Sequence, residues 1–556
     1  MLAHLILLYC ISFENLHETD YPASSHFNNE APFFMIGKTK CPDLSFEALQ
    51  ERSCSTKMEH EALFKRLCSV PAVSTTAVIC YLVYCFFRGG LYRYPGPVLA
   101  SFTNWWWTAS VKSKHHHETM IKLHRKYGDV VRIGPNALSI ARVDCIPKIY
   151  GINNRFTKSE MYNLFAPRVK GVPLPSLLSM RDEKEYARQK KLIAHAYSLT
   201  SLTEYEPLVD GIILKLMDQF KSKFDKQDNK SCDLSVWLRY YTSDVIMQLS
   251  FGNNLGFVEQ GRDIADYMKE LDKLLDLAAI ALTMPWLGWF IQHSPFISMI
   301  RKESTEFPEF SRQQIREHVV EHMKRKSNQQ SEAGDKNGRP LDMLDRFLIA
   351  AQADTPTGYD LDLVISWTLA NIMAGSDTTA IGLRATVYYL LKTPDALRNL
   401  KDELSKASLS YPVTWKESQR LPYLDACIKE ALRLHPAIGF GLERKVPATG
   451  LVLPDGFNLS PGTNVSVNAW RWLQSKDEDM NAYKERIGHM KRADLVFGSG
   501  TRSCLGKNIS LLEIYKTVPT LFLKFDIELV DPSKSWVTTN RWTVRQEGMD
   551  CWLSPL

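Results

Sequence analysis

A run of ten residues near the carboxyl end of the chain sets one cysteine among glycine, arginine and phenylalanine at fixed spacing. Residues 497–506 read Phe-Gly-Ser-Gly-Thr-Arg-Ser-Cys-Leu-Gly, the pattern FxxGxRxCxG around Cys504. At average residue frequencies, five fixed positions recur by chance in a chain of this length roughly once in ten thousand cases. Glycine lets backbone amides come close to the sulfur and stabilise a thiolate, the form of cysteine that binds metal. The rarity of the pattern argues against a buried cysteine that happens to lie in a glycine-rich turn.

This segment resembles the heme-binding loop of the cytochromes P-450. The resemblance implies that the protein binds heme b (iron protoporphyrin IX), with Cys504 as the axial ligand of the iron, a ligand that favours O–O cleavage. It also implies that Arg502 pairs with a heme propionate and that Phe497 covers the cysteine from the other side. Gly500 and Gly506 are expected to let the backbone approach the sulfur and the heme closely.

A second segment reads Ala-Gly-Ser-Asp-Thr-Thr from residue 374, within a helix predicted over Leu361 to Lys392. Taken alone, such a segment is more typical of a solvated helix face or of hydroxyl groups bonded back to helix carbonyls. Beside the cysteine loop, it resembles the oxygen-activating segment of the same family. The resemblance implies that Asp377 and Thr378 are catalytic and relay protons during oxygen activation. Gly375 is expected to leave room for dioxygen.

Glu430 and Arg433 stand three residues apart in a predicted helix, so their side chains share one face. By resemblance, this pair is a buried structural lock beneath the heme loop, completed by an arginine that matches Arg471. The family pattern has a proline and an upstream loop before that arginine, and this chain lacks both. Removing one partner of a buried ion pair costs about 3–5 kcal/mol. The sequence therefore leaves open an inactive or mis-spliced chain that lacks the segment before Arg471.

Many family members carry Trp-xxx-Arg at a further position, where the side chains reach a heme propionate. This chain has Tyr186 and Lys190 there, so an ammonium group replaces the forked guanidinium. Lys190 is nevertheless expected to bind the cofactor. Together with Lys191 and Lys507, it is also a candidate for a basic face that meets an acidic reductase domain. A plain cluster of solvated charges is the alternative.

The composition sets limits on partners and on further metal sites. The chain has 556 residues, with 68 Lys and Arg against 62 Asp and Glu, which gives a net charge of +6 and requires no nucleic-acid partner. Eleven cysteines without paired spacing indicate neither a disulfide framework nor a zinc site. His115-His116-His117 is predicted to be a polar loop, because three successive side chains do not converge on one ion.

The elements around these motifs predict a mainly helical protein with small β-sheets, of the α+β class. Apolar residues at helical spacing dominate the middle of the chain, and short β-branched runs flank a Gly-Pro turn early in it. With the resemblance, this pattern implies the cytochrome P-450 fold. Helices are predicted over much of 183–325 and at about 361–392, 394–407 and 423–435, strands at 130–133, 138–141, 463–467 and 525–529, and a surface loop at 324–340.

The stretch at 69–87 contains no charged residue and would rise about 28 Å as a helix, close to the ~30 Å core of a bilayer. It is predicted to be a single transmembrane anchor, with a buried core helix as the alternative. Residues 1–68 are an unassigned extension, and 94–556 form the predicted heme-thiolate catalytic domain. The resemblance implies the endoplasmic reticulum membrane and a cytoplasmic catalytic domain, although the flanking charges alone favour a cytoplasmic amino terminus.

The whole pattern resembles fungal microsomal enzymes, particularly the pisatin-demethylase-like group. It implies a heme-thiolate monooxygenase that inserts one atom of dioxygen into an apolar small molecule, in secondary metabolism or in xenobiotic or phytoalexin oxidation. Electrons are expected from NADPH through a separate reductase, with membrane lipid as a further partner. A heme-thiolate isomerase or dehydratase is the alternative, and the predicted proton relay argues against it. The predicted pocket wall contains Ala370, Met373, Ala374, Phe440 and Thr543.

Overall fold

The computed structural model describes residues 72–152, 154–166, 168–169, 172–224, 230–293, 313–321, 341–354, 360–468 and 494–556. The chain divides into two compact units, Met1–Phe86 and Phe87–Leu556. Several sequence predictions lie outside the described residues: the extension 1–68, the start of the anchor, the loop at 324–340 and Arg471.

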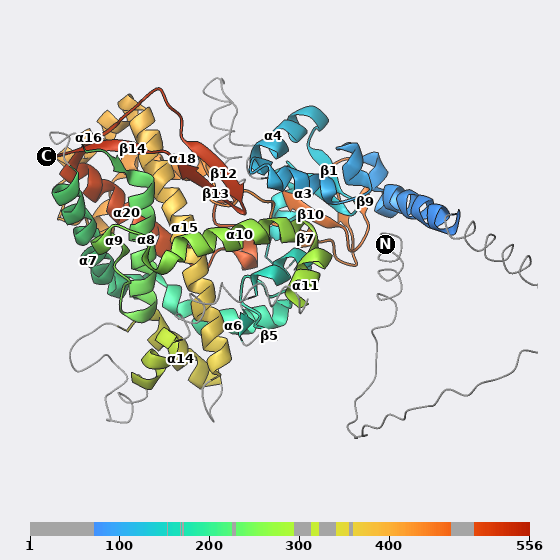
Figure 1. The fold of residues 1–556 in the computed structure, drawn as a ribbon, viewed down its shortest axis with the longest axis horizontal. Coiled ribbons are helices and arrows are strands. Elements are labelled where there is room, and N and C mark those ends of the chain that lie inside the picture. Colours follow the sequence, from blue (N-terminus) through green and yellow to red (C-terminus); the bar gives the residue numbers. More distant parts are fainter. Residues whose placement is uncertain are drawn as a thin grey trace, which may run out of the picture. The chain divides into compact units, whose positions relative to one another are not determined.

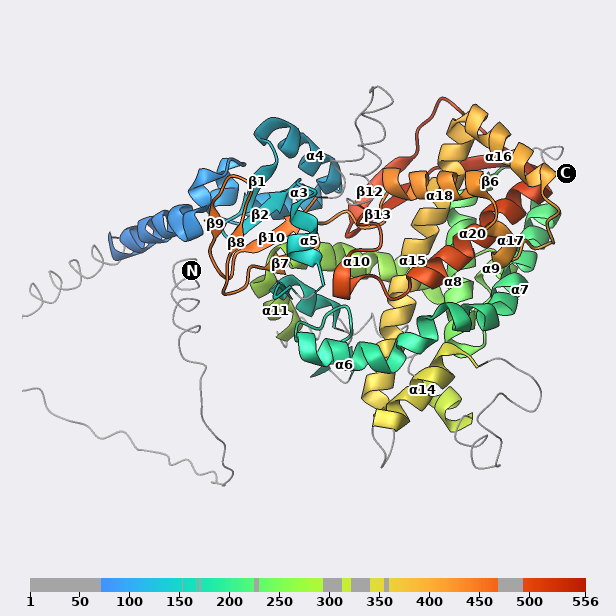
Figure 2. The same cartoon turned by 180° about the vertical axis from the view of Figure 1, so that it is seen from behind.

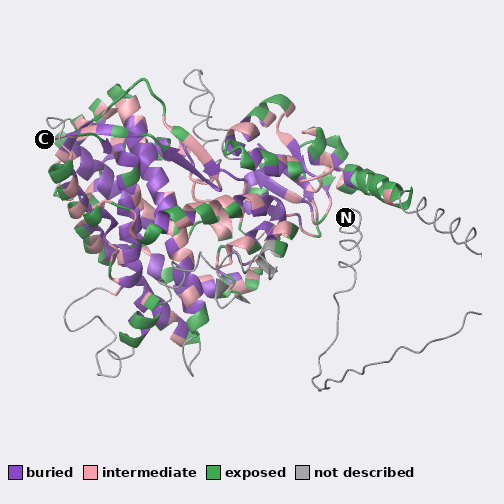
Figure 3. Cartoon of the chain, in the orientation of Figure 1, coloured by how far each residue is buried: buried purple, intermediate pink, exposed green. Residues whose placement is uncertain are grey.

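Among the described residues, one helix is long and apolar enough to cross a membrane, Ala72–Arg93. Its α-helical part ends at Phe87, where the predicted anchor also ends, and a 3-10 helix, η1 (Arg88–Arg93), follows. Gly89 and Gly90 cause this change, because their φ angles of 59° and 73° lie in the left-handed region. Large apolar side chains along the helix are exposed (Figure 3).

The second unit is mainly helical, as the sequence predicted (Figure 1). Its helices begin and end at local signals such as Asp360, whose carboxylate accepts a hydrogen bond from the amide of Leu363 and so caps the longest helix. The helices are α3 (Trp105–Lys112), α4 (His116–Tyr127), α5 (Cys145–Tyr150), α6 (Glu183–Ile193), α7 (Leu199–Lys223), α8 (Leu234–Phe251), α9 (Phe257–Gln260), α10 (Tyr267–Thr283), α11 (Pro285–His293), α14 (Met343–Asp354), α15 (Leu361–Lys392), α16 (Pro394–Lys406), α17 (Trp415–Ser418), α18 (Pro422–Leu434) and α20 (Lys507–Lys524).

Helix α15 runs through this unit and packs against α8, α14, α18 and α20 (Figures 1 and 2). Most of its residues from Ser376 to Tyr388 are buried, so it belongs to the core rather than to one surface (Figure 3). A helix buried on several sides is apolar around its circumference, which explains why Asp377 within it needs charged partners.

The β structure consists of one larger sheet and several small ones. The five-stranded sheet has the order β1-β2-β10-β7-β3, in which β10 runs parallel to β2 and the other pairs are antiparallel. The strands are β1 (Val130–Gly134), β2 (Ala137–Ile140), β3 (Thr157–Lys158), β4 (Arg168–Val169), β5 (Val172–Pro173), β6 (Cys232–Asp233), β7 (Arg444–Lys445), β8 (Leu451–Val452), β9 (Asn458–Leu459), β10 (Asn464–Val467), β11 (Phe525–Leu529), β12 (Val537–Arg541), β13 (Thr543–Glu547) and β14 (Asp550–Pro555).

Candidate active site

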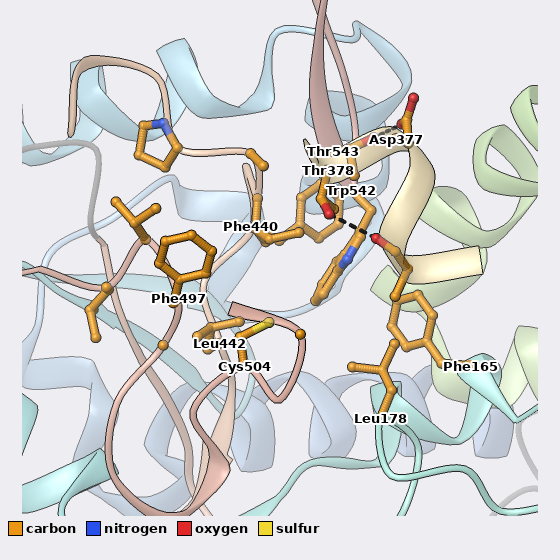
Figure 4. A pocket seen from close by; sticks show the side chains of 18 of the residues that line it. Phe165, Leu178, Asp377, Thr378, Phe440, Leu442, Phe497, Cys504, Trp542 and Thr543 are labelled. Atoms are coloured by element: carbon orange, nitrogen blue, oxygen red, sulfur yellow. Dashed lines mark hydrogen bonds between the residues drawn. The ribbon is translucent and has the colours of Figure 1, made fainter. Parts of the chain in front are cut away.

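A cavity of about 410 Å³ lies within the second unit, bordered by α15, the loop before α20 and the β12–β13 hairpin (Figure 4). Most of the residues that the sequence singled out line it. They are Ala370, Met373, Ala374, Asp377, Thr378, Phe440, Phe497, Arg502, Cys504, Gly506 and Thr543. Four described site candidates from the sequence are not part of its wall: Lys190, Gly500, Glu430 and Arg433.

The Cys504 side chain is exposed to this cavity, while the protein around it keeps the thiol from bulk solvent. The amide of Cys504 donates to the carbonyl oxygen of Phe497 over 2.8 Å, which closes the loop into a tight turn. Burial raises the pKa of the thiol, while hydrogen bonds from the amides of Gly506 and Lys507 and the Lys507 charge act in the opposite direction. Because α20 begins at Lys507, the positive end of its dipole also favours a thiolate here.

The two glycines of the cysteine loop, Gly500 and Gly506, have different surroundings. At Gly500, where φ is +65°, a Cβ would lie 1.8 Å from the carbonyl oxygen of Tyr150, so this glycine lets the loop pack on the end of α5. The expectation that Gly500 lets the backbone approach the sulfur and the heme stays a prediction beside this contact. At Gly506, no atom among the described residues lies within 4 Å of such a Cβ. Gly506 therefore borders open space beside Cys504.

Arg502 is held by an acidic partner at the start of α6. Its guanidinium makes a bidentate contact with Glu183, with Nη2 and Nε at 2.8 and 3.0 Å from the carboxylate oxygens, and Nη1 donates to the Met180 carbonyl over 3.0 Å. Its Cζ atom lies 3.6 Å from the centre of the Tyr186 ring, so Tyr186 supplies the stacking surface that a tryptophan would offer. Lys190 instead donates to the carbonyl oxygen of Thr501 over 2.8 Å.

Two further buried cations, Lys158 and Arg444, lie near Arg502, and the sequence analysis predicted neither of them as a site residue. Lys158 on β3 donates to the carbonyls of Leu177 and Leu178 over 3.2 and 2.6 Å. Burial, and then the positive charges of Arg502 and Arg444, lowers the pKa of Lys158 well below its ordinary value. Clustered buried cations are costly unless anions balance them. The cluster therefore favours a ligand that brings negative charge to this end of the cavity.

Asp377 sits among arginines on the opposite side of the site. Its carboxylate lies 2.8 Å from Nε of Arg545 and 3.2 Å from Nε of Arg239. Burial opposes ionisation, but Arg545, Arg239 and Arg384 outweigh it and hold the pKa of Asp377 well below its usual range. Asp377 is therefore an ionised carboxylate at neutral pH.

Thr378 donates from Oγ1 to the carbonyl oxygen of Ala374 over 2.7 Å, the back-bonded geometry that the sequence analysis gave as the alternative for this segment (Figure 4). Gly375 lines the cavity, and it also makes a close helix contact: a Cβ there would lie 2.8 Å from Cδ1 of Ile246 on α8. Its missing side chain therefore makes room for the neighbouring helix, and its role toward dioxygen stays a prediction.

Comparison with known proteins decides the family of this chain. The family model described as Cytochrome P450 matches residues 94–548, most of the chain. The chain belongs to the cytochrome P450 family. The cysteine loop and the AGSDTT segment both lie within the matched residues, and they line one cavity.

This P450 is similar to curated monooxygenases of filamentous fungi. The cytochrome P450 monooxygenase cicH of Emericella nidulans is 38% identical over 492 residues, 84% of this chain and 95% of cicH. A cytochrome P450 monooxygenase of Aspergillus flavus is 35% identical over 482 residues, covering 83% of this chain and 91% of its own. A cytochrome P450 monooxygenase of Aspergillus terreus is 34% identical over 491 residues, which cover 84% of this chain and 97% of its own. The protein is therefore an oxidoreductase of the monooxygenase class.

The family implies heme iron, and the residues of this P450 fit that group. The Cys504 thiol faces the cavity with two amides directed at it, and Gly506 leaves open space beside it. Buried Lys158 and Arg502 line the cavity and offer positive charge that would suit the carboxylates of an acidic cofactor, and buried Arg444 adds to that charge. Both the donor set and the charge match a heme with a thiolate ligand.

The structural lock of this P450 differs from its expected form. Arg433 contacts Glu430 through Nε at 2.6 Å, so the predicted pair exists. The pair is not buried, however, because 52% of the Glu430 side chain and 21% of the Arg433 side chain are exposed. The expectation of a buried lock is therefore wrong for these two residues, and Arg471 lies outside the described part of the chain.

The histidine run is also different from the prediction. His116 and His117 begin helix α4, both are buried, and both line the cavity, so the expected polar loop is wrong. His116 Nδ1 lies 2.9 Å from Oγ of Ser110. Burial lowers the pKa of His116 to about 3 and that of His117 to about 4, which makes both rings neutral at pH 7. The apolar residues that follow at positions 120 and 121 were the sequence signal for this helix.

Proposed function

We propose that this P450 is a heme-thiolate monooxygenase of fungal secondary metabolism that inserts one atom of dioxygen into an apolar small molecule. The observation that carries the proposal is that Cys504, Asp377 and Thr378 line the same cavity. The heme, when bound, supplies the oxidising chemistry, and electrons come from NADPH through a separate reductase.

The residues of the chain have separate roles in this proposal. Cys504 binds the heme iron as a thiolate, with the amides of Gly506 and Lys507 and the α20 amino terminus offsetting its charge. Thr378 holds a proton on Oγ1 that is directed at the Ala374 carbonyl, within reach of the cavity. Asp377 takes up a proton from solvent and passes it toward Thr378 when its contact with Arg545 loosens.

Arg502, Arg444 and Lys158 bind the carboxylates of the heme in this proposal. Arg502 and Lys158 are favoured over Lys190 because both are buried and line the cavity, whereas Lys190 lies outside the cavity wall with its ammonium on a backbone carbonyl. Arg444 is also buried and adds its charge from outside the wall. Arg502 then exchanges part of its contact with Glu183 for a propionate, a contact of the same bidentate type.

The apolar helix Ala72–Arg93 supports a single-pass anchor in the endoplasmic reticulum membrane, with the catalytic domain on the cytoplasmic side. Its length and exposed apolar side chains suit a bilayer better than water. The test is fractionation of the full chain expressed in yeast. We expect it in the microsomal pellet after alkaline carbonate washing, and release into the supernatant would contradict the anchor.

A heme-thiolate isomerase or dehydratase is the alternative. Such an enzyme needs no proton relay, whereas this chain keeps Asp377 ionised next to Thr378 at the cavity. Turnover that stops when NADPH or the reductase is omitted supports the monooxygenase, and turnover that continues supports the alternative.

The role of Cys504 as the ligand of the heme iron is tested by the variant Cys504→Ser in the full chain. The reduced, carbon-monoxide-treated wild type should give the red-shifted Soret band of a thiolate-bound heme, and the variant should lose both the band and the oxidising activity. Cys427→Ser is the matched control, because Cys427 on α18 is half-buried and outside the cavity wall. A variant at position 504 that keeps band and activity contradicts the proposal, and a wild type that binds no heme favours an inactive chain.

A further inference from the structure

Aromatic rings form a continuous wall on one side of the cavity. The Trp542 ring centre lies 4.8 Å from that of Phe165, 5.5 Å from that of Phe440 and 6.3 Å from that of Tyr162. The ring planes are inclined to one another by 53°, 63° and 87°, so Phe440 and Tyr162 meet the indole edge to face and Phe165 meets it at a tilt. All four rings line the cavity, and Figure 4 shows three of them around it.

Trp542 has an uncommon backbone conformation for its size. Arg541 pairs with Thr543 across the β12–β13 hairpin, so Trp542 alone makes the turn. Its φ angle is 84°, in the left-handed region where glycine is the favoured residue. A bulky residue held in a strained conformation at a cavity wall points to a functional constraint, because such strain gathers at ligand-binding sites.

The surrounding structure fixes the position of this indole. The carbonyl oxygen of Trp542 accepts the amide of Gly439 over 2.9 Å, and Thr543 forms a bridge with Ile438. On the other strand, Nε of Arg541 lies 2.7 Å from the Asp276 carboxylate on α10. Both arms of the hairpin are therefore tied to other elements, and the indole is presented as a rigid surface.

Hydrogen-bonding groups stand beside the aromatic wall. The His116 ring lies 5.1 Å from Phe440, edge to face, and both His116 and His117 line the cavity. Because burial keeps these imidazoles neutral, each can donate or accept one hydrogen bond without burying a charge. An apolar ring with a hydroxyl or carbonyl group matches both parts of this wall.

We propose that the substrate is a planar aromatic compound with a hydroxyl or carbonyl group, and that Trp542 determines this specificity. The inference rests on the proposed monooxygenase function and names the substrate class of the same cavity. Edge-to-face contacts with a ligand ring strengthen binding by about two- to twelvefold per ring pair beyond the area buried, and a saturated ring gains none of this.

The test compares 2-naphthol with decahydro-2-naphthol, which share a carbon skeleton and a hydroxyl group but differ in aromaticity. Isothermal titration calorimetry on the heme-loaded full chain gives the two dissociation constants. We expect 2-naphthol to bind at least about tenfold more tightly, since the wall offers three or more ring contacts. Equal affinities, or tighter binding of the saturated alcohol, would overturn the proposal.

Trp542→Gly removes the indole and also relieves the backbone, because glycine adopts the left-handed conformation freely. The buried indole leaves a cavity, so the melting temperature should fall, although the relief of the backbone offsets part of the loss. The variant should keep the red-shifted carbon-monoxide band, which shows that it folds, and lose the preference for 2-naphthol. Phe440→Leu is a second variant that should weaken the preference by a smaller factor. Trp105→Leu is the matched control, because Trp105 is 60% exposed and outside the cavity wall.

The outcomes separate this proposal from the proposed function. A wild type with the red-shifted carbon-monoxide band but no aromatic preference refutes the substrate class and leaves the monooxygenase intact. A Trp542→Gly variant that keeps both its heme and the full preference refutes the role of Trp542. Loss of the preference in this variant, with the control unchanged, supports both parts of the inference.

Discussion

The hydroxyl group of Thr543 donates a hydrogen bond to Oδ2 of Asp377 over 3.1 Å, and Nε of Arg545 donates to the same oxygen over 2.8 Å. Thr543 follows Trp542 directly and lines the cavity, while Asp377 belongs to the core helix α15. A side chain of the proposed substrate pocket therefore helps to position the carboxylate of the proposed proton relay. We infer that Thr543 is a positioning residue for Asp377.

Thr543→Val should test this role because it removes the hydroxyl and keeps the shape of the side chain. A hydrogen bond to a charged group contributes about 1.5–3 kcal/mol, so the free energy of unfolding should fall by about that amount. If Thr543 also positions the relay, less product should form per NADPH consumed, which a purely structural role would not change. Thr543→Ser should restore both values. A variant with unchanged product yield per NADPH would contradict the positioning role.

The raised pKa of Glu443 predicts that the stability of the folded protein depends on pH. Glu443 is buried at the cavity, where Ser159 donates to Oε2 over 2.7 Å, and burial raises its pKa from 4.5 to about 7. The folded state therefore binds this proton more tightly than the unfolded state does. The stability from Glu443 is fully present below pH 4.5 and is lost as the pH rises through about 7.

Glu443→Gln should abolish this dependence. Relative to the variant, the wild type should lose on the order of 3 kcal/mol of unfolding free energy between pH 4.5 and pH 7. Denaturant titrations at several pH values measure the difference. Glu547→Gln, at an exposed position on β13, serves as the control and should run parallel to the wild type. Parallel curves for the wild type and the Glu443 variant would contradict the shifted pKa.

Local sequence signals were enough for much of the fold. The predicted helix at 361–392 matches α15, and the predicted strand at 525–529 matches β11, because apolar periodicity and the caps that end each element are local. The hairpin of β1 and β2 was also predicted correctly from its Gly-Pro turn. The loop around Cys504 was found because its whole pattern lies within ten residues.

Local sequence signals could not predict which residues the site residues contact. Thr543 and Asp377 are 166 residues apart, and Lys158 meets Arg502 through strands and loops from distant parts of the chain. Each of these residues has an ordinary sequence context, so only tertiary packing brings the charges together. The histidines at 116 and 117 were missed for a related reason, since a polar run suggests solvent when its burial depends on the rings of Trp107 and Phe440.

Gly375→Ala should reveal the close contact between α15 and α8. The added methyl would lie 2.8 Å from Cγ1 and Cδ1 of Ile246, and such overpacking costs about 1–3 kcal/mol. The higher helix propensity of alanine offsets up to about 1 kcal/mol of this. Adding Ile246→Ala removes both clashing atoms, so the double variant should be more stable than the sum of the single effects predicts. Additive effects in this double-mutant cycle would show that the methyl added at position 375 does not contact Ile246.

Gly500→Ala and Gly506→Ala form a matched pair within one loop, because the first glycine faces protein and the second faces open space. At position 500, the methyl would overlap the Tyr150 carbonyl, and the left-handed backbone alone costs about 1–3 kcal/mol. We expect Gly500→Ala to lower the melting temperature of the heme-free chain, and Gly506→Ala to leave it nearly unchanged. Gly506→Ala should instead weaken heme binding in a spectrophotometric titration, because its methyl enters the space beside Cys504. If Gly506→Ala bound heme as tightly as the wild type does, that space could not be the heme site.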